Sequence, residues 1–173
     1  MSRSVPPVDA ERAALLAELT AQRQHILGIL DGLDDEAFDR ATLPSGWTIR
    51  GLLAHLAFDD ERFWFRGVLA AEPDVTEAVL AGEPNAWTLL DDLPVAQVLD
   101  AYRTEIERAA PILAEVDLDA PPSWWPPDLF GDWRLPSNRA VILHVIVETA
   151  CHAGHLDAAR ELIDGRQWVV LDG

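Results

Sequence analysis

Four side chains that can bind a metal ion or carry a proton recur near the end of the chain. They are separated by four, four and three residues, in the order His144, Glu148, His152 and His155, so a helix would carry them along one side. His55 stands alone in another apolar segment. A buried imidazole without a hydrogen-bond partner or a ligand costs free energy. The pattern therefore predicts two helices that turn these residues inward, toward a shared site that a metal ion could complete.

The spacing favours three of these residues as ligands of one ion. Glu148 and His152 lie about one helical turn apart and project side by side, and His55 from a facing helix would complete the set. Two imidazoles and one carboxylate suit Zn²⁺ first, and also Ni²⁺ or Fe²⁺. Three protein ligands would leave one coordination position open, as in catalytic zinc sites. The alternative is a set of hydrogen-bonded core residues, with Glu148 in an ion pair to Arg62 or Arg66.

Three further residues have roles that the spacing leaves open. His155 is our candidate catalytic residue, as a proton carrier, and it could instead be a fourth ligand or a hydrogen-bond donor beside the ion. His144 lies too far along the helix to share the site, which favours a structural role. Asp59, four residues after His55, could orient that imidazole, or it could belong to a solvated acidic run over residues 59–61.

Periodic apolar residues predict the helices that would carry these groups. Four long segments have helical spacing, and linkers that contain proline or glycine separate them. Their approximate bounds are residues 9–30, 48–68, 92–116 and 137–165. A long connection over residues 72–90 separates the second segment from the third. We therefore expect one all-α domain over residues 1–173, folded as an antiparallel four-helix bundle with a long crossover connection.

Polar, glycine and proline residues mark where these helices begin, end or bend. Thr48 and Ser137 precede apolar periodic segments, as N-cap residues do. Gly165 follows the last segment in the position of a C′ glycine. Pro111 falls inside the third segment, so a kink or a break is expected there. After the last helix, residues 168–171 could pack back as an extended strip.

The composition disfavours several classes of protein. The net charge is −17, from 13 basic and 30 acidic residues, and it repels phosphate backbones and anionic lipids, so we expect no nucleic-acid partner. No apolar stretch approaches the length of about 20 residues that spans a bilayer, and the first residues lack the apolar core of a signal peptide. The single cysteine, Cys151, cannot form an internal disulfide. We therefore expect a cytoplasmic protein without membrane contact.

Two neighbouring tryptophans stand in a loop that prolines stiffen on both sides. Trp124 and Trp125 lie between Pro121-Pro122 and Pro126-Pro127. Large aromatic side chains held in such a loop could cover a binding site, or they could be buried in the interface of a homodimer.

Two motifs resemble those of a known superfamily. Residues 46–57, GWTIRGLLAHLA, are similar to the second-helix signature of the DinB-like superfamily, which includes the mycothiol-dependent maleylpyruvate isomerases. Residues 143–157, which contain ETACHAGHLD, are similar to its last-helix signature. The chain looks closest to an uncharacterised actinobacterial branch of that superfamily.

The resemblance implies a DinB-like bundle with a divalent metal ion held by its second and last helices. His55 matches the ligand of the second helix, and His152 matches the last histidine. Glu148 matches the position four residues earlier, where many members have histidine and the maleylpyruvate isomerases have glutamate. Those isomerases have an additional C-terminal domain that this sequence is too short to hold, so we do not expect the isomerase reaction itself.

As the resemblance implies, the metal ion of related members binds the thiol of a small cofactor such as mycothiol. Coordination converts a thiol, whose pKa is about 8.5, to the nucleophilic thiolate, which could attack an electrophilic substrate. We therefore predict a metal-dependent thiol S-transferase or an isomerase-like detoxification enzyme. Two alternatives are a metal-bound hydroxide that performs hydrolysis, and a non-catalytic metal-binding or structural bundle that acts in a stress response.

Overall fold

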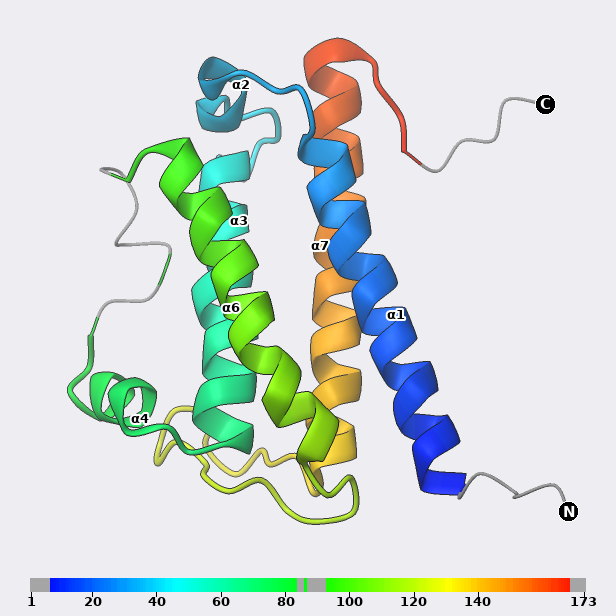
Figure 1. Ribbon diagram of the computed structural model, residues 1–173. Helices are drawn as coiled ribbons and strands as arrows, with labels where there is room; N and C mark the ends of the chain where they lie inside the picture. Colours follow the sequence, from blue (N-terminus) through cyan, green and yellow to red (C-terminus); the bar gives the residue numbers. More distant parts are fainter. Residues whose placement is uncertain (1–6, 84–85, 87–92, 169–173) are drawn as a thin grey trace, which may run out of the picture.

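The computed structural model describes residues 7–83, 86 and 93–168, and within them the protein is all-helical, as predicted. Its elements are α1 (Pro7–Leu30), α2 (Asp35–Asp39), α3 (Ile49–His55), η1 (Leu56–Leu69), α4 (Pro73–Leu80), α6 (Val95–Glu115) and α7 (Asn138–Asp164). Because η1 follows α3 directly, the two form one long segment. This segment, α1, α6 and α7 lie side by side (Figure 1), and they correspond to the four segments that apolar periodicity predicts.

The helices α1 and α7 run in the same direction (Figure 1). Near the start of both helices, the Arg139 guanidinium donates to the Glu11 carboxylate. Near their other ends, His25 Nε2 lies 2.9 Å from Asp157 Oδ1. The contacts keep the same order along both helices, so α1 and α7 are parallel neighbours.

The helix α6 packs against α3 and η1 and also runs parallel to them. Arg50, near the start of α3, donates to the Leu93 carbonyl just before α6, at 2.8 Å. Arg66, near the end of η1, is bonded to Glu105 halfway along α6. The chain must therefore return from the end of η1 to the end where α3 began. The long connection that contains α4 makes this return (Figure 1), so parallel pairs of helices stand beside antiparallel ones.

The predicted ends of the second and last helices are confirmed. The Thr48 hydroxyl accepts from the Gly51 amide at 3.1 Å, and the Ser137 hydroxyl accepts from the Ala140 amide at 3.3 Å. These bonds satisfy backbone donors that have no partner inside the helix. Gly165 ends α7 with a φ of 77°, a left-handed conformation that favours glycine.

Of the kink or break predicted at Pro111, the break is wrong, since α6 continues through this residue to Glu115, and the kink stays a prediction. The helical hydrogen bonding also resumes beyond it, because the Val116 amide donates to the Ile112 carbonyl at 2.9 Å. Pro111 is exposed and stands in the second-last turn of the helix. A proline there removes one backbone donor and crowds one carbonyl, and packing of the remaining turns against η1 holds the helix together.

Only the first residue of the predicted C-terminal strip lies within the described residues. The Trp168 ring stacks on His25 of α1, with ring centroids 5.4 Å apart and planes inclined by 15°. A Cβ atom added to Gly28 would lie 2.0 Å from this indole, so the ring occupies the space that the glycine leaves open. Residues 169–171 lie outside the described part of the chain, and the strip stays a prediction.

Two apolar clusters form the core, and a polar layer lies between them. The first cluster includes Ile26, Leu53, Tyr102 and Leu156, and the second includes Leu19, Phe65, Leu113 and Ile142. Along η1, the first cluster ends at Ala57 and the second begins at Phe63. Between them, Asp60 and Glu61 are buried. The middle of the molecule is therefore where the core is interrupted by groups that need polar partners.

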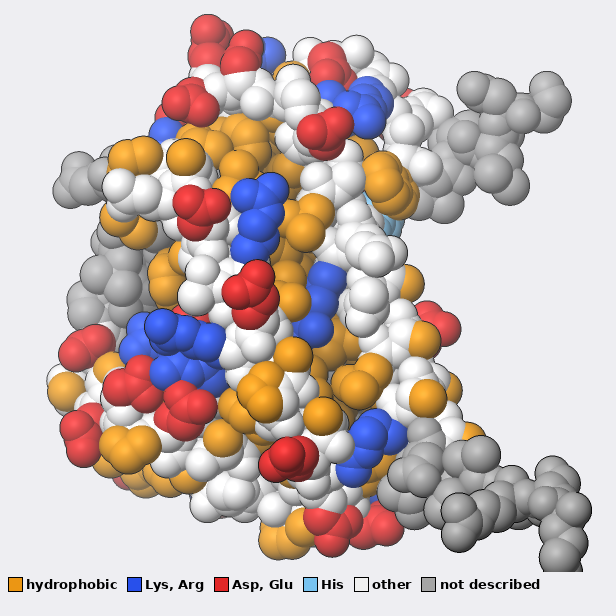
Figure 2. All heavy atoms as spheres, viewed as in Figure 1, with side chains coloured by type: hydrophobic (Ala, Val, Ile, Leu, Met, Phe, Trp, Pro, Cys, Tyr) orange, Lys and Arg blue, Asp and Glu red, His pale blue; other side chains and the backbone are white. Residues whose placement is uncertain are grey.

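On the face shown in Figure 2, basic side chains lie beside acidic ones. Near α4, the Arg66 guanidinium donates to Glu72 at 2.7 Å and to Asp74 at 2.6 Å. Among the described helices, none combines the length and the apolar character that crossing a membrane requires.

Candidate metal centre

His55 is the last residue of α3, at the point where the helix widens into η1. Its Nδ1 lies 2.9 Å from Asp59 Oδ2. Because an ionised carboxylate only accepts hydrogen bonds, Nδ1 carries the proton and donates. Nε2 is then the imidazole nitrogen with a lone pair for a metal ion. Asp59 therefore orients His55, which is one of the two roles that its spacing predicts.

The wider helix η1 brings Asp60 to the same side as His55. In a π-helix the backbone hydrogen bonds join residues five apart, so each turn holds more residues than in an α-helix and a five-residue step returns closer to the starting side. The bond from the Ala70 amide to the Phe65 carbonyl, at 3.1 Å, has this spacing. In an α-helix, a residue five positions after His55 would point about 140° away. The side chain of Asp60 is buried, and within the described part of the chain its Oδ2 has no hydrogen-bond partner.

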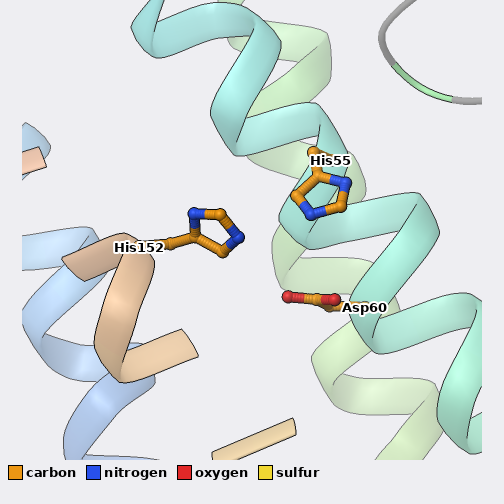
Figure 3. Close-up of side chains that lie close together, drawn as sticks. All are labelled: His55, Asp60 and His152. Carbon is orange, nitrogen blue, oxygen red and sulfur yellow. The ribbon is translucent and has the colours of Figure 1, made fainter. Parts of the chain in front are cut away.

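His152 of α7 faces these two residues across the molecule. Its ring centroid lies 5.1 Å from that of His55, with the planes nearly perpendicular at 82°. Figure 3 shows His55, Asp60 and His152 pointing toward one another. One donor atom from each lies within 4.8 Å of the other two. His152 Nδ1 is buried and has no hydrogen-bond partner among the residues that the structure describes.

The environment sets the protonation of these three groups. Burial, together with the charges of His55 and His155, lowers the pKa of His152 to about 4, so its imidazole is neutral at pH 7. Burial also lowers the pKa of His55, but the hydrogen bond to Asp59 and the neighbouring carboxylates outweigh this effect and raise it. Burial raises the pKa of Asp60 to about 7, against the opposing charge of His55.

These residues fit a divalent metal ion. Two imidazoles and a carboxylate are the donor types that Zn²⁺, Ni²⁺ and Fe²⁺ accept. Zn²⁺ bonds to nitrogen and oxygen are about 2.0–2.2 Å long, so the three donor atoms, which lie within 4.8 Å of one another, would move closer together to bind one ion. A cation would also give a partner to the buried carboxylate of Asp60, which otherwise carries a desolvation cost.

Glu148 lies at the side of this group, one turn before His152. Its Oε2 is 3.7 Å from His152 Nε2, and its side chain is 38% exposed. In the described part of the chain, no ion pair joins Glu148 to Arg62 or Arg66, the alternative that the sequence leaves open. Glu148 is therefore placed beside the other donors, at the solvent side of the site.

The two remaining histidines of α7 lie on either side of the group. His155 is exposed, and its ring centroid is 5.7 Å from that of His152. This position gives His155 access both to the site and to water. His144 contacts Trp64 and Trp133, with ring centroids 4.7 Å and 5.5 Å away, and burial lowers its pKa. His144 is thus part of an aromatic environment.

An aromatic cluster adjoins the group on the side of the second core cluster. It consists of Trp64, Trp125, Phe130 and Trp133, with Trp64 and Phe130 stacked at 5.6 Å. Trp64 follows Asp60 by four residues, so the cluster begins about one turn from the donors. Trp133 is 44% exposed. The loop that carries Trp125 is packed against η1, where Trp125 contacts Trp64.

The sequence reasoning missed Asp60, and the expectation of a solvated acidic run at residues 59–61 is wrong. Asp60 and Glu61 are 3% and 1% exposed. Glu61 accepts two hydrogen bonds from Arg23 of α1, at 2.7 Å and 2.6 Å. The signal available in the sequence is the run of three consecutive acidic residues within an apolar helix. Such a run covers more than half of the circumference of a helix, so at least one of the three is expected to face the core. The side on which each lies depends on the widening of η1.

The comparison with protein families shows to which family the chain belongs. The family model for mycothiol-S-transferase matches residues 14–165. The chain belongs to the mycothiol-S-transferase family. This family is part of the DinB-like superfamily, so the resemblance of the two motifs is confirmed. No curated protein and no solved structure matches the chain.

The region matched to the mycothiol-S-transferase family contains the whole group of converging donors. It begins within α1 and ends at Gly165, where α7 stops. The family description names a thiol as the substrate, and a thiol is a ligand of the metal ions that the donors fit.

Proposed function

We propose that the protein is a metal-dependent S-transferase that joins mycothiol, or a similar small thiol, to an electrophilic compound. The observation that supports it most is the convergence of His55, Asp60 and His152 in a member of the mycothiol-S-transferase family. In this proposal, the four long helical segments form a bundle of the DinB-like type, and the protein acts in the cytoplasm.

The proposed ligands of the divalent ion are His55, Glu148 and His152, with Zn²⁺ as the first candidate and Ni²⁺ or Fe²⁺ as others. A bound divalent ion supplies the positive charge that favours the thiolate form of a thiol over the protonated form. Asp59 holds the His55 ring so that Nε2 faces the site. His152, with a pKa of about 4, presents a neutral imidazole without losing a proton first.

His155 is the proposed proton carrier. When mycothiol binds, its thiol proton must leave the site, and the exposed His155 ring near His152 can pass it to water. The sulfur then forms a bond to the electrophilic carbon, and the leaving group departs with the bonding electron pair. The exposed Trp133 ring of the aromatic cluster offers an apolar surface for the carbon skeleton of this second substrate.

The test combines metal content with a transfer assay. Protein purified without chelator should contain one equivalent of metal and should convert mycothiol and monochlorobimane to a fluorescent adduct. The variant His152→Ala should lose both properties. The matched control His144→Gln removes a histidine of the same helix outside the proposed ligands, and it should keep its metal. Metal-free wild-type protein, or adduct formation that is unchanged in His152→Ala, would contradict the proposal.

The alternatives from the sequence are less favoured, because the family is defined by transfer to or from a thiol. A hydrolase that uses a metal-bound hydroxide, and a non-catalytic metal-binding or structural stress protein, both lack a specific observation in their support.

We also propose that two copies associate through the exposed side of α7. Leu143 and Val147, one turn apart on this helix, are 45% and 63% exposed, and neighbouring exposed apolar side chains can form a contact surface. Sedimentation velocity of the purified protein should therefore show a dimer, and a monomer at all accessible concentrations would rule this association out.

A further inference from the structure

We infer that Asp60 is a direct ligand of the metal ion, as a fourth protein donor on the buried side of the site. The inference rests on the proposed metal site, and it adds a residue that neither motif spacing nor the family match assigns. It would give the ion two imidazoles, from His55 and His152, and two carboxylates, from Asp60 and Glu148.

The first support is the geometry of η1. Asp60 stands five residues after His55, and the π-helical backbone returns it to the His55 side. A donor atom of Asp60 lies within 4.8 Å of donors of both His55 and His152. Figure 3 shows the carboxylate of Asp60 directed into the space between the two rings.

The second support is the state of the Asp60 carboxylate itself. The residue is 3% exposed, and its Oδ2 is buried without a hydrogen-bond partner in residues 7–83, 86 and 93–168. The adjacent Glu61 is also buried, but Arg23 neutralises it through two hydrogen bonds. Buried carboxylates persist when they are paired or when they coordinate a metal ion. Glu61 therefore has a cationic partner in Arg23, and a metal ion would supply such a partner to Asp60.

The two carboxylates then have different positions. Asp60 approaches from the core, where solvent does not reach it, whereas Glu148 is 38% exposed beside His152. Asp60 is thus the fixed carboxylate, and Glu148 lies on the side from which a thiol enters. A thiol would then bind as a fifth ligand or in place of the exposed Glu148. Two ionised carboxylates would also balance the charge of a divalent ion between two neutral imidazoles.

The experiment measures metal binding directly. Zn²⁺ dissociation constants are determined by competition with a chromogenic chelator, using metal-free wild-type protein, Asp60→Asn and Asp100→Asn. The last variant removes the same charge at an exposed position of α6. We expect Asp60→Asn to weaken Zn²⁺ binding by about 100-fold, at or beyond the upper end of what loss of an outer-shell partner costs. Asp100→Asn should bind as the wild type does.

Co²⁺ in place of Zn²⁺ distinguishes a ligand from a residue that only supports the ligands. Replacing a carboxylate ligand changes the visible absorption bands of bound Co²⁺, so the spectrum of Asp60→Asn should differ from that of the wild type. Thermal unfolding of the metal-free proteins controls for folding, and Asp60→Asn should be at least as stable, because a buried amide costs less than a buried unpaired charge.

The other possible results distinguish failure of the inference from failure of the proposed function. Wild-type affinity in Asp60→Asn, or weaker affinity with an unchanged Co²⁺ spectrum, overturns the inference and leaves the three-ligand site in place. A wild-type protein that binds no metal overturns both the inference and the proposed function. Metal binding that depends on Asp60, in a protein that makes no mycothiol adduct, supports the inference and overturns the proposed function.

Discussion

At the scale of single residues, the chemistry depends on how each histidine is held. His55 donates from Nδ1 to Asp59, whereas the Nδ1 of His152 has no hydrogen-bond partner among the described residues. The pKa of His55 is raised, because the hydrogen bond to Asp59 and the nearby carboxylates outweigh its burial. Burial and the charges of His55 and His155 lower the pKa of His152 to about 4. A metal ion must displace a proton from His55 as pH falls, but not from His152.

The substitution Asp59→Asn tests the support of His55. It replaces an anionic acceptor with a neutral one, so the imidazole becomes a weaker and less oriented ligand. We expect Zn²⁺ affinity to fall by about 10- to 100-fold, measured by chelator competition with Asp100→Asn as the control. The absorption spectrum of bound Co²⁺ should match that of the wild type, because the ligands are unchanged, in contrast to the spectrum of Asp60→Asn. An unchanged affinity would show that Asp59 does not support the ligand.

At the scale of helices, the caps and the backbone geometry determine which residues face the site. The bonds of Thr48 and Ser137 fix where α3 and α7 begin, and therefore which residues face inward along each helix. The widening at His55 then changes the register within one continuous segment. Such π-helical turns are often found at functional sites. Pro111 shows the opposite case, a local irregularity that the packed helix α6 accommodates.

The substitution Pro111→Ala measures how much the proline in α6 lowers the free energy of unfolding. Alanine restores a backbone donor and removes the ring clash, while it gives the unfolded chain more freedom. We expect the free energy of unfolding in urea to rise by about 1–2 kcal/mol. The neighbouring exposed Ala110→Gly should lower it by about 1 kcal/mol if this turn is helical in solution. A less stable Pro111→Ala protein would mean that the ring makes a favourable contact.

At the scale of the whole molecule, the site lies in a polar layer between two apolar clusters. Arg23 of α1 and Glu61 of η1 are buried together in this layer, and the Arg23 guanidinium also lies 5.6 Å from the Phe65 ring centroid. The ion pair joins α1 to the helix that carries His55 and Asp60. It therefore couples the position of the donors to the packing of the first helix.

The substitution Glu61→Gln tests this coupling. It leaves the Arg23 charge buried with a neutral partner, so the free energy of unfolding should fall by about 3–5 kcal/mol. The double variant Arg23→Met, Glu61→Met removes both charges and should recover most of the loss. Urea unfolding of the three proteins provides the measurement. A loss of less than about 1 kcal/mol in Glu61→Gln would mean that water reaches the pair.

The sequence by itself predicted the helical segments and two of the three residues, His55 and His152, whose donor atoms lie close together in the structure. Apolar periodicity and capping residues are local properties, so they predicted where α3 and α7 begin and that α7 ends at Gly165. The four-residue step from Glu148 to His152 places them on one side of any regular helix, and the two motifs identified the superfamily that the family match confirms.

Only the tertiary structure decided the position of Asp60 and the environment of His144. In a regular helix the five-residue step from His55 would turn Asp60 away, and the helix widens there for reasons that local residue preferences do not encode. The contacts of His144 with Trp64 and Trp133 join α7 and the loop before it to η1, which is distant in sequence. The parallel pairing of α1 with α7 likewise follows from the returning connection before α6. Each of these features depends on contacts between segments, which spacing along one segment cannot specify.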